Sequence, residues 1–157
     1  MTIHVAVRQD GAGILDITAR AGVFDPEEVA CVGELWEEYL QKGSEASGYT
    51  FLVYRSGEKV WGFACFGARA LTQGTYDLYW IATDPDHRRN GVGQDLLQRV
   101  EQAVRDLGGR LIVVETSGVE KYAPTQRFYL ATGYNHEATL RDFYQTGDDL
   151  VIFTKHV

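Results

Sequence analysis

Two arginines and two glycines lie close together near the middle of the chain, in the run Arg88-Arg89-Asn90-Gly91-Val92-Gly93. The preceding segment, Tyr76 to Thr83, is rich in aromatic and β-branched residues and ends at Asp84-Pro85, which is typical of a strand that stops at a turn. From Val92 onward, apolar residues recur at helical spacing until Gly108-Gly109. The first turn of a helix has unpaired backbone N–H groups and carries the positive end of the helix dipole. The run therefore predicts an anion-binding loop between a strand and a helix.

The residue types in this loop limit which kind of anion it could bind. Gly91 and Gly93 lack the Cβ atoms that would keep a ligand away from the backbone, and Arg88 and Arg89 add positive charge. A dinucleotide-binding fingerprint would need a glycine where Leu96 stands, and a P-loop would end in Gly-Lys-Ser/Thr. The spacing excludes both of these loops and favours a pyrophosphate held in another way, although a glycine-rich turn that only starts a helix remains an alternative.

Two segments carry a resemblance to a known family. The loop matches the pattern Arg/Gln-x-x-Gly-x-Gly/Ala after a strand and an Asp/Asn-Pro turn, and so resembles the acetyl-CoA loop of the GCN5-related N-acetyltransferase (GNAT) superfamily. The segment Gln126 to Tyr134 is similar to the GNAT pattern Phe-Tyr-x-x-x-Gly-Phe/Tyr. Together the two motifs cover about the C-terminal half of the chain, and the N-terminal half agrees only in the order of its elements.

The resemblance implies acetyl-CoA as the cosubstrate. Its pyrophosphate is expected on the amides of the loop, and its thioester carbonyl on backbone N–H groups at the end of the preceding strand. GNAT proteins often place an asparagine that contacts the pantetheine arm where this chain has Tyr122, so Thr125 is a candidate substitute. The expected cofactor-binding residues are Ile81, Ala82, Thr83, Arg88, Arg89, Asn90, Gly91, Val92, Gly93, Gln94 and Thr125.

Acyl transfer to an amine needs a neutral amine, a polarised carbonyl and a leaving thiolate that can take a proton. The resemblance implies that Tyr129 protonates the leaving thiolate. A phenol with a pKa near about 10 keeps its proton at neutral pH and can supply it. Simple packing of Phe128 and Tyr129 is the alternative. Glu115, at the end of a predicted central strand, is the candidate base, and we expect it to be partly buried. Its competitors are a water chain and the side chains of Asp77, Asp142 and Tyr144.

Aromatic and acidic residues accompany these groups and point to the acceptor. Aromatic faces combined with carboxylates suit a small molecule that carries an ammonium group, although core packing also explains such aromatic residues. The candidate substrate-binding residues are Tyr79, Trp80, Asp142 and Tyr144. The chain has 15 basic and 22 acidic residues, a net charge of −7 that argues against nucleic-acid binding and mildly favours a cationic partner.

The elements that position these residues can be read from local patterns. A cap and a first-turn proline at Asp25-Pro26 start a helix that we expect to end at Gly43. A shorter helix is expected near Ile14 to Ala21, and another over Pro124 to Thr132. Further strands are expected at Thr2 to Arg8, Tyr49 to Tyr54, Lys59 to Ala68, Arg110 to Thr116, Tyr134 to Phe143 and Leu150 to Lys155, with a turn at Gln145 to Asp149.

This order predicts one α/β domain over residues 1–157. We expect a GNAT-type mixed, largely antiparallel sheet of about seven strands, with helices on both faces and a parallel central pair, Tyr76 to Thr83 beside Arg110 to Thr116. No basic leader and no apolar stretch of membrane length occurs, so a cytoplasmic protein with no membrane partner is expected. Cys31 and Cys65 lack metal-ligand spacing and are expected to be buried thiols, with no metal.

The predicted function is therefore acetyl-CoA-dependent N-acetylation of a primary amine, preferably a small molecule, by direct attack on the thioester. Three alternatives remain open at this point. The chain could be a non-catalytic acyl-CoA-binding or sensor domain, a protein N-terminal or lysine acetyltransferase, or a structural partner that forms a homodimer through its C-terminal strands.

Overall fold

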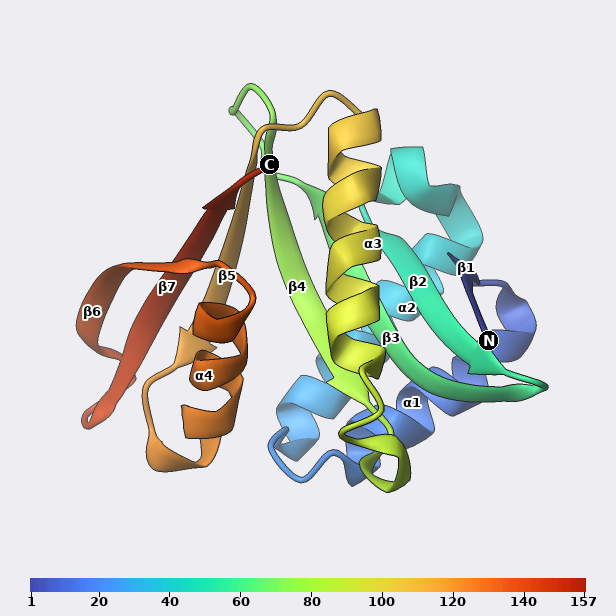
Figure 1. The fold of residues 1–157 in the computed structure, drawn as a ribbon, viewed down its shortest axis with the longest axis horizontal. Helices are drawn as coiled ribbons and strands as arrows, with labels where there is room; N and C mark the ends of the chain where they lie inside the picture. The colour runs from blue at the N-terminus through green and yellow to red at the C-terminus, as the bar shows by residue number, and fades with distance from the viewer.

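The computed structural model describes all residues from 1 to 157. Seven strands form one sheet in the order β1-β2-β3-β4-β5-β7-β6, and every neighbouring pair is antiparallel except the parallel pair β4 and β5 (Figure 1). The mixed, largely antiparallel sheet and its parallel central pair are as predicted. The strands are β1 (Thr2–Val5), β2 (Thr50–Ser56), β3 (Lys59–Ala68), β4 (Thr75–Thr83), β5 (Leu111–Ser117), β6 (Asn135–Gln145) and β7 (Asp148–His156).

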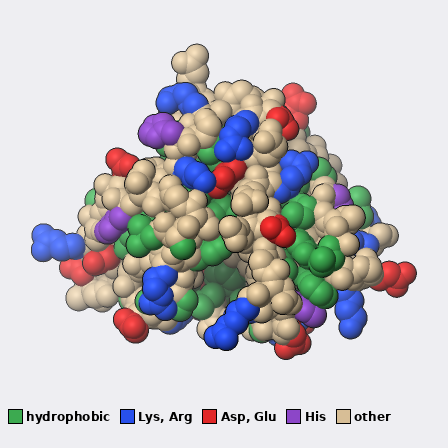
Figure 2. Space-filling model, in the orientation of Figure 1, with side chains coloured by type: hydrophobic (Ala, Val, Ile, Leu, Met, Phe, Trp, Pro, Cys, Tyr) green, Lys and Arg blue, Asp and Glu red, His purple; other side chains and the backbone are tan.

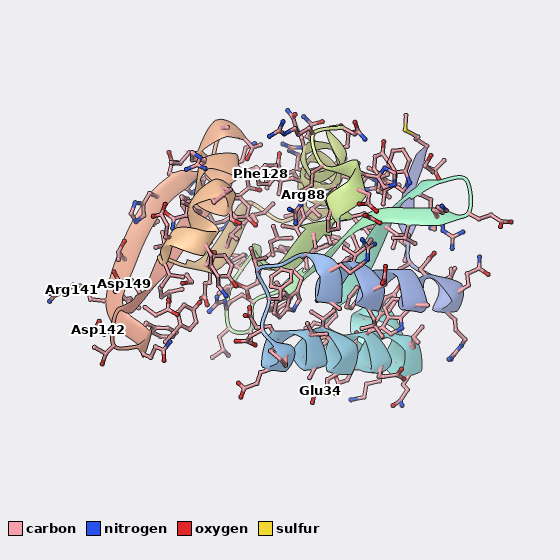
Figure 3. All side chains as sticks on the ribbon, turned by 90° about the horizontal axis from the view of Figure 1, so that it is seen from below. Glu34, Arg88, Phe128, Arg141, Asp142 and Asp149 are labelled. Carbon is pink, nitrogen blue, oxygen red and sulfur yellow. The ribbon has the colours of Figure 1, made fainter.

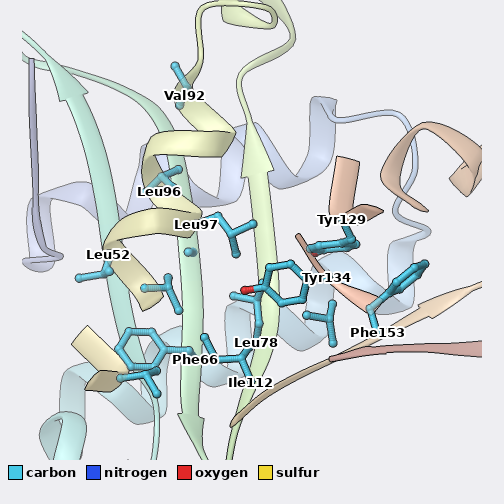
Figure 4. Close-up of a cluster of buried hydrophobic side chains, with 14 of the residues drawn as sticks. Leu52, Phe66, Leu78, Val92, Leu96, Leu97, Ile112, Tyr129, Tyr134 and Phe153 are labelled. Atoms are coloured by element: carbon cyan, nitrogen blue, oxygen red, sulfur yellow. The ribbon is translucent and has the colours of Figure 1, made fainter. Parts of the chain in front are cut away.

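Helices cover both faces of the sheet, as expected. α1 (Gly11–Arg20) and α2 (Pro26–Ser47) pack on one face, and α3 (Val92–Asp106) and α4 (Ala123–Ala131) lie on the other (Figure 1). Each face has its own core. The cluster under α3 and α4 includes Leu96, Leu97 and Phe153 (Figure 4), and the cluster under α1 and α2 includes Ile14, Trp36, Phe51 and Phe63.

The start of α2 has the predicted cap. The Asp25 carboxylate accepts the Glu28 backbone N–H at 2.8 Å, and the Glu28 carboxylate accepts the Asp25 N–H at 3.2 Å. The predicted end of this helix at Gly43 is only partly right. Gly43 has a φ of +77° and breaks the helix, but helical structure resumes and ends at Gly48.

Three other expectations need correction. β1 ends at Val5 rather than Arg8, because the next residues form a short 3-10 turn in which Asp10 accepts the Val7 N–H at 2.8 Å. The turn between β6 and β7 is shorter than predicted, because β6 bulges: residues 141–144 fit between the pairs Leu140↔Leu150 and Gln145↔Asp148. Cys31 is exposed on α2, whereas Cys65 is buried.

The parallel pair β4 and β5 does not stay paired along its length. The strands are in register from Thr75↔Leu111 to Leu78↔Val114, after which β4 pairs only with β3. Cys65 on β3 lies opposite Trp80 and Phe66 lies opposite Leu78, so Tyr79 is the extra residue of a β-bulge. A bulge bends its strand and increases the local twist. The two strands therefore diverge toward their carboxyl ends, as Figure 1 shows, with α4 beside the opening.

No helix of the protein is both long enough and apolar enough to cross a membrane.

Candidate active site

A cavity of about 1700 Å³ lies where β4 and β5 diverge. Its walls come from the ends of these two strands, from α4, from the loop before α3, from the α1–α2 loop and from the β6–β7 hairpin. Figure 2 shows a hollow between α4 and the loop leading into α3, with hydrophobic side chains on its walls and basic side chains at its rim. The cavity collects most of the residues that the sequence singled out.

The loop before α3 has the features of an anion site. Gly91 is the residue that caps α3, with a φ of +75°, and α3 begins at Val92 as predicted. None of the backbone N–H groups from Arg88 to Gln94 donates a hydrogen bond within the protein. The free donors and the positive end of the α3 dipole both favour a phosphate group at this loop.

The expected cofactor-binding residues are nearly all in the cavity wall. Asn90 is the exception, being exposed outside the wall. A Cβ atom at Gly93 would lie 3.6 Å from Phe128, an ordinary contact distance, so the start of α3 lies close to α4. Figure 3 shows Arg88 and Phe128 on the neighbouring loop and helix. The residues in the wall are Ile81, Ala82, Thr83, Arg88, Arg89, Gly91, Val92, Gly93, Gln94 and Thr125.

Tyr129 lies on α4 with its ring in the core. The side chain is 3% exposed and packs against Phe128, Tyr134 and Phe153 at centroid distances of 5.4 to 5.6 Å. Its hydroxyl has no hydrogen-bond partner in the protein and opens to the cavity. Burial raises the pKa of Tyr129 well above its usual value. Figure 4 shows the hydroxyl oxygen on the side of the ring that faces β4.

A chain of ionic contacts joins β4 and β5 near the point where the two strands separate. The Arg69 guanidinium donates to the Asp77 carboxylate at 2.6 Å and to Glu115 Oε1 at 3.1 Å. These hydrogen bonds, first the one to Asp77, raise the pKa of Arg69. The side chain of Glu115 is 42% exposed, because β5 has left β4 at this point, so its burial is only partial. Glu115 Oε2 makes no hydrogen bond in the protein.

Tyr79 and Trp80 both line the cavity near α1 and α2. The bulge turns both side chains toward that face, where the rings of Trp80 and Phe24 meet edge to face at 5.3 Å and Tyr79 packs against Tyr49. Tyr144 also lines the cavity, from the β6–β7 hairpin. Burial, followed by the nearby carboxylates of Glu115, Asp148 and Glu28, raises the pKa of the Tyr144 hydroxyl.

Asp142, the fourth candidate substrate-binding residue, lies outside the cavity wall. It has a φ of +55°, and its carboxylate accepts the Gly147 N–H at 2.9 Å, so it stabilises the hairpin bulge. In Figure 3, Asp142 lies with Arg141 and Asp149 at the far end of the hairpin. Asp148 lines the cavity, and so does Glu28, which the sequence had marked only as part of a helix cap.

Charge is unevenly distributed around the cavity. The loop before α3 contributes Arg88 and Arg89. The rest of the wall has six carboxylates and two basic residues, Lys121 and Arg69, and Arg69 is paired with Asp77. The carboxylates in the wall are those of Asp25, Glu27, Glu28, Asp77, Glu115 and Asp148. One end therefore suits an anion and the other a cation.

Comparison with known proteins identifies the family. The sequence model of the acetyltransferase (GNAT) family matches residues 18–134. The structure of a GNAT-family protein from Desulfovibrio desulfuricans is 41% identical in sequence, with a TM-score of 0.95, over 99% of this chain and 98% of that one. The chain therefore belongs to the GNAT acetyltransferase family. No relative was found among curated proteins.

More distant structures share the fold. The ribosomal-protein-S18-alanine N-acetyltransferase of Escherichia coli is 21% identical, with a TM-score of 0.77, over 99% of this chain and 93% of that one. An aminoglycoside 6′-N-acetyltransferase in complex with coenzyme A is 15% identical, with a TM-score of 0.76, over 99% and 97% of the two chains. The acceptors of these two proteins differ in kind, so the shared fold does not select one.

Proposed function

We propose that the protein transfers the acetyl group of acetyl-CoA to a primary amine of a small molecule, by direct attack of the amine on the thioester. The observation that carries this proposal is the Tyr129 hydroxyl, which lacks a partner and opens into the same cavity as the unpaired amides of the loop before α3. Family membership supports the acetyl donor. The coenzyme A complex of the aminoglycoside acetyltransferase, which shares the fold, supports it further.

The cavity offers a matching group for each part of acetyl-CoA. The pyrophosphate would take hydrogen bonds from the amides of Arg88 to Gln94 and charge from the two arginines. Beyond Leu78 the edge of β4 that faces β5 has no strand partner. An extended chain with amide groups, such as the pantetheine arm, can take the place of that missing strand. The same edge, from Ile81 to Thr83, would supply N–H donors to the thioester carbonyl.

The chemical step needs two proton transfers. The amine nitrogen bonds to the carbonyl carbon, the carbon–sulfur bond breaks, and the sulfur leaves with its electron pair. Tyr129 would give its proton to this sulfur and recover one from solvent. Burial favours the neutral forms of both phenol and thiol, so it raises their pKa values together and keeps the transfer feasible. The proton lost by the amine would pass to Glu115 or to water.

We propose the chemical class of the acceptor from the aromatic and acidic residues at one end of the cavity. Tyr79 and Trp80 line the same cavity as the carboxylates of Glu28 and Asp148. An ammonium group is attracted both by aromatic faces and by carboxylates. A small molecule that carries such a group beside the reacting amine fits this end of the cavity better than a neutral or anionic acceptor.

The proposal is tested by following thiol release from acetyl-CoA with a panel of amino acids, polyamines, aminoglycosides and peptides with free N-termini or lysines. We expect turnover with small cationic amines and none with the peptides. Turnover confined to peptides would replace the small-molecule acceptor with a protein. Binding of acetyl-CoA without turnover on any amine would favour a sensor.

Glu115 is proposed as the base, and Glu115→Gln tests it. We expect kcat/KM to fall about tenfold, less than a full general-base effect because water can also carry the proton. Glu34→Gln is the matched control, since Glu34 is exposed on α2 and away from the cavity (Figure 3). A change smaller than about threefold in Glu115→Gln, measured at several pH values, would assign proton removal to water alone.

A further inference from the structure

The α1–α2 loop, Ala21 to Asp25, forms a wall of the acceptor end and is named here the acceptor strap. Two hydrogen bonds hold it, one from each side of the cavity. The Arg88 guanidinium donates to the Ala21 carbonyl at 2.6 Å, from the loop before α3. The Tyr122 hydroxyl donates to the Val23 carbonyl at 3.0 Å, from the 3-10 turn between β5 and α4. The strap is therefore tied to both arms of the diverging sheet.

The strap carries groups that face the acceptor. Phe24 meets the ring of Trp80 at 5.3 Å with an interplanar angle of 80°, which fixes the aromatic side of this end. Asp25 begins α2 through its reciprocal bonds with Glu28. Phe24 and Asp25 follow Val23 directly, and Asp25 is hydrogen-bonded to Glu28. A shift of the strap would therefore move both the Phe24 ring and the Glu28 carboxylate.

Tyr122 is placed to control that position. It is 9% exposed and lines the cavity, and its hydroxyl is 3.3 Å from Glu28 Oε2 as well as hydrogen-bonded to Val23. Burial, with Glu28 next, raises the pKa of Tyr122 well above its usual value, so the hydroxyl keeps the proton that it donates. Its hydroxyl points to the strap, which is a different use of this position from a contact to the pantetheine arm.

We propose that Tyr122 is a positioning residue for the amine acceptor, which acts by holding the acceptor strap at the Val23 carbonyl and not by binding acetyl-CoA. This inference rests on the proposed function for its acceptor. It makes a distinction that can be measured: the hydroxyl of Tyr122 affects the acceptor, whereas the free backbone amides of the loop before α3 affect the acetyl donor.

The test variant is Tyr122→Phe, which keeps the ring and removes only the hydroxyl. We expect the acceptor KM to rise about fivefold, with kcat and the Kd for acetyl-CoA each within about twofold, because the contacts of the hydroxyl with the Val23 carbonyl and the Glu28 carboxylate are lost together. The matched control is Tyr39→Phe. Tyr39 also donates its hydroxyl to a backbone carbonyl, that of Ala6 at 2.7 Å, but it lies outside the cavity. The control should leave the acceptor KM unchanged.

Backbone NMR relaxation of Gly22 to Phe24 gives a readout that needs no turnover. We expect larger-amplitude motion in Tyr122→Phe and wild-type motion in Tyr39→Phe. Unchanged motion in Tyr122→Phe, or larger motion with an unchanged acceptor KM, would overturn the proposal. Larger motion in a protein that acetylates no amine would instead overturn the proposed function, and with it the acceptor role of Tyr122.

Discussion

Tyr129→Phe is expected to lower kcat about a thousandfold while leaving the Kd for acetyl-CoA within about twofold of wild type. The ring fills the same space in the core, because its contacts with Phe128, Tyr134 and Phe153 do not involve the hydroxyl. Only the proton for the leaving sulfur is lost. Stopped-flow measurement of thiol release, together with calorimetric binding of acetyl-CoA, separates the two effects.

The matched control is Tyr134→Phe. Tyr134 packs in the same cluster, but its hydroxyl donates to the buried Glu101 carboxylate at 3.0 Å and does not line the cavity. This control should lose stability and keep kcat. If Tyr129→Phe also keeps kcat, Tyr129 is a packing residue and the protein has another source for the proton.

The pH dependence of the wild-type enzyme gives a separate prediction for the same hydroxyl. Tyr129 serves as an acid only while it holds its proton, and burial raises its pKa. Loss of activity by ionisation of Tyr129 is therefore shifted to higher pH than for an ordinary tyrosine. We expect kcat to show no alkaline decline up to about pH 9.5 in a pH profile. A decline centred near about pH 8 would assign the acid to another group.

Gly91→Val is expected to weaken acetyl-CoA binding about thirtyfold. Gly91 has a φ of +75°, a conformation that a β-branched residue adopts only with strain. Relief of that strain would shift the free backbone amides of the loop. Because no protein atom lies within 4 Å of an ideal Cβ at Gly91, the effect would not come from a clash inside the protein. Calorimetric titration with acetyl-CoA measures the change.

Gly57→Val is the matched control for this variant. Gly57, in the turn between β2 and β3, has a φ of +63° and no protein atom within 4 Å of an ideal Cβ. The Gly57→Val variant imposes the same kind of strain far from the loop before α3. It should lower the stability of the protein without changing the Kd for acetyl-CoA. Equal weakening of acetyl-CoA binding by both variants would mean that the Gly91 effect is a general loss of stability.

Local signals made much of the fold predictable. The bounds of β3 are those expected from its apolar run, because Gly57 marks the turn before it. The start of α3 at Val92 follows from the glycines that surround it. Each of these features depends on residues within about one helical turn of one another, a range over which sequence patterns are informative.

The acceptor end was less predictable, because its contacts join distant parts of the chain. The pairing of Glu115 with Arg69 spans 46 residues and the bond from Tyr122 to Val23 spans 99. The bulges at Tyr79 and in β6 also decide which side chains enter the cavity, so that Asp148 lines it and Asp142 does not. A bulge of this kind shifts every later residue of its strand to the other face, and no local pattern marked either one.

Direct acetyl transfer from acetyl-CoA to a small amine is tested most directly by mass spectrometry with an isotopically labelled acetyl group. With the amine that gives the fastest thiol release, we expect the label on the amine nitrogen, and the mass of the protein should stay unchanged throughout turnover. Label that accumulates on the protein, or acetyl-CoA that binds and is never consumed with any amine, would contradict direct transfer.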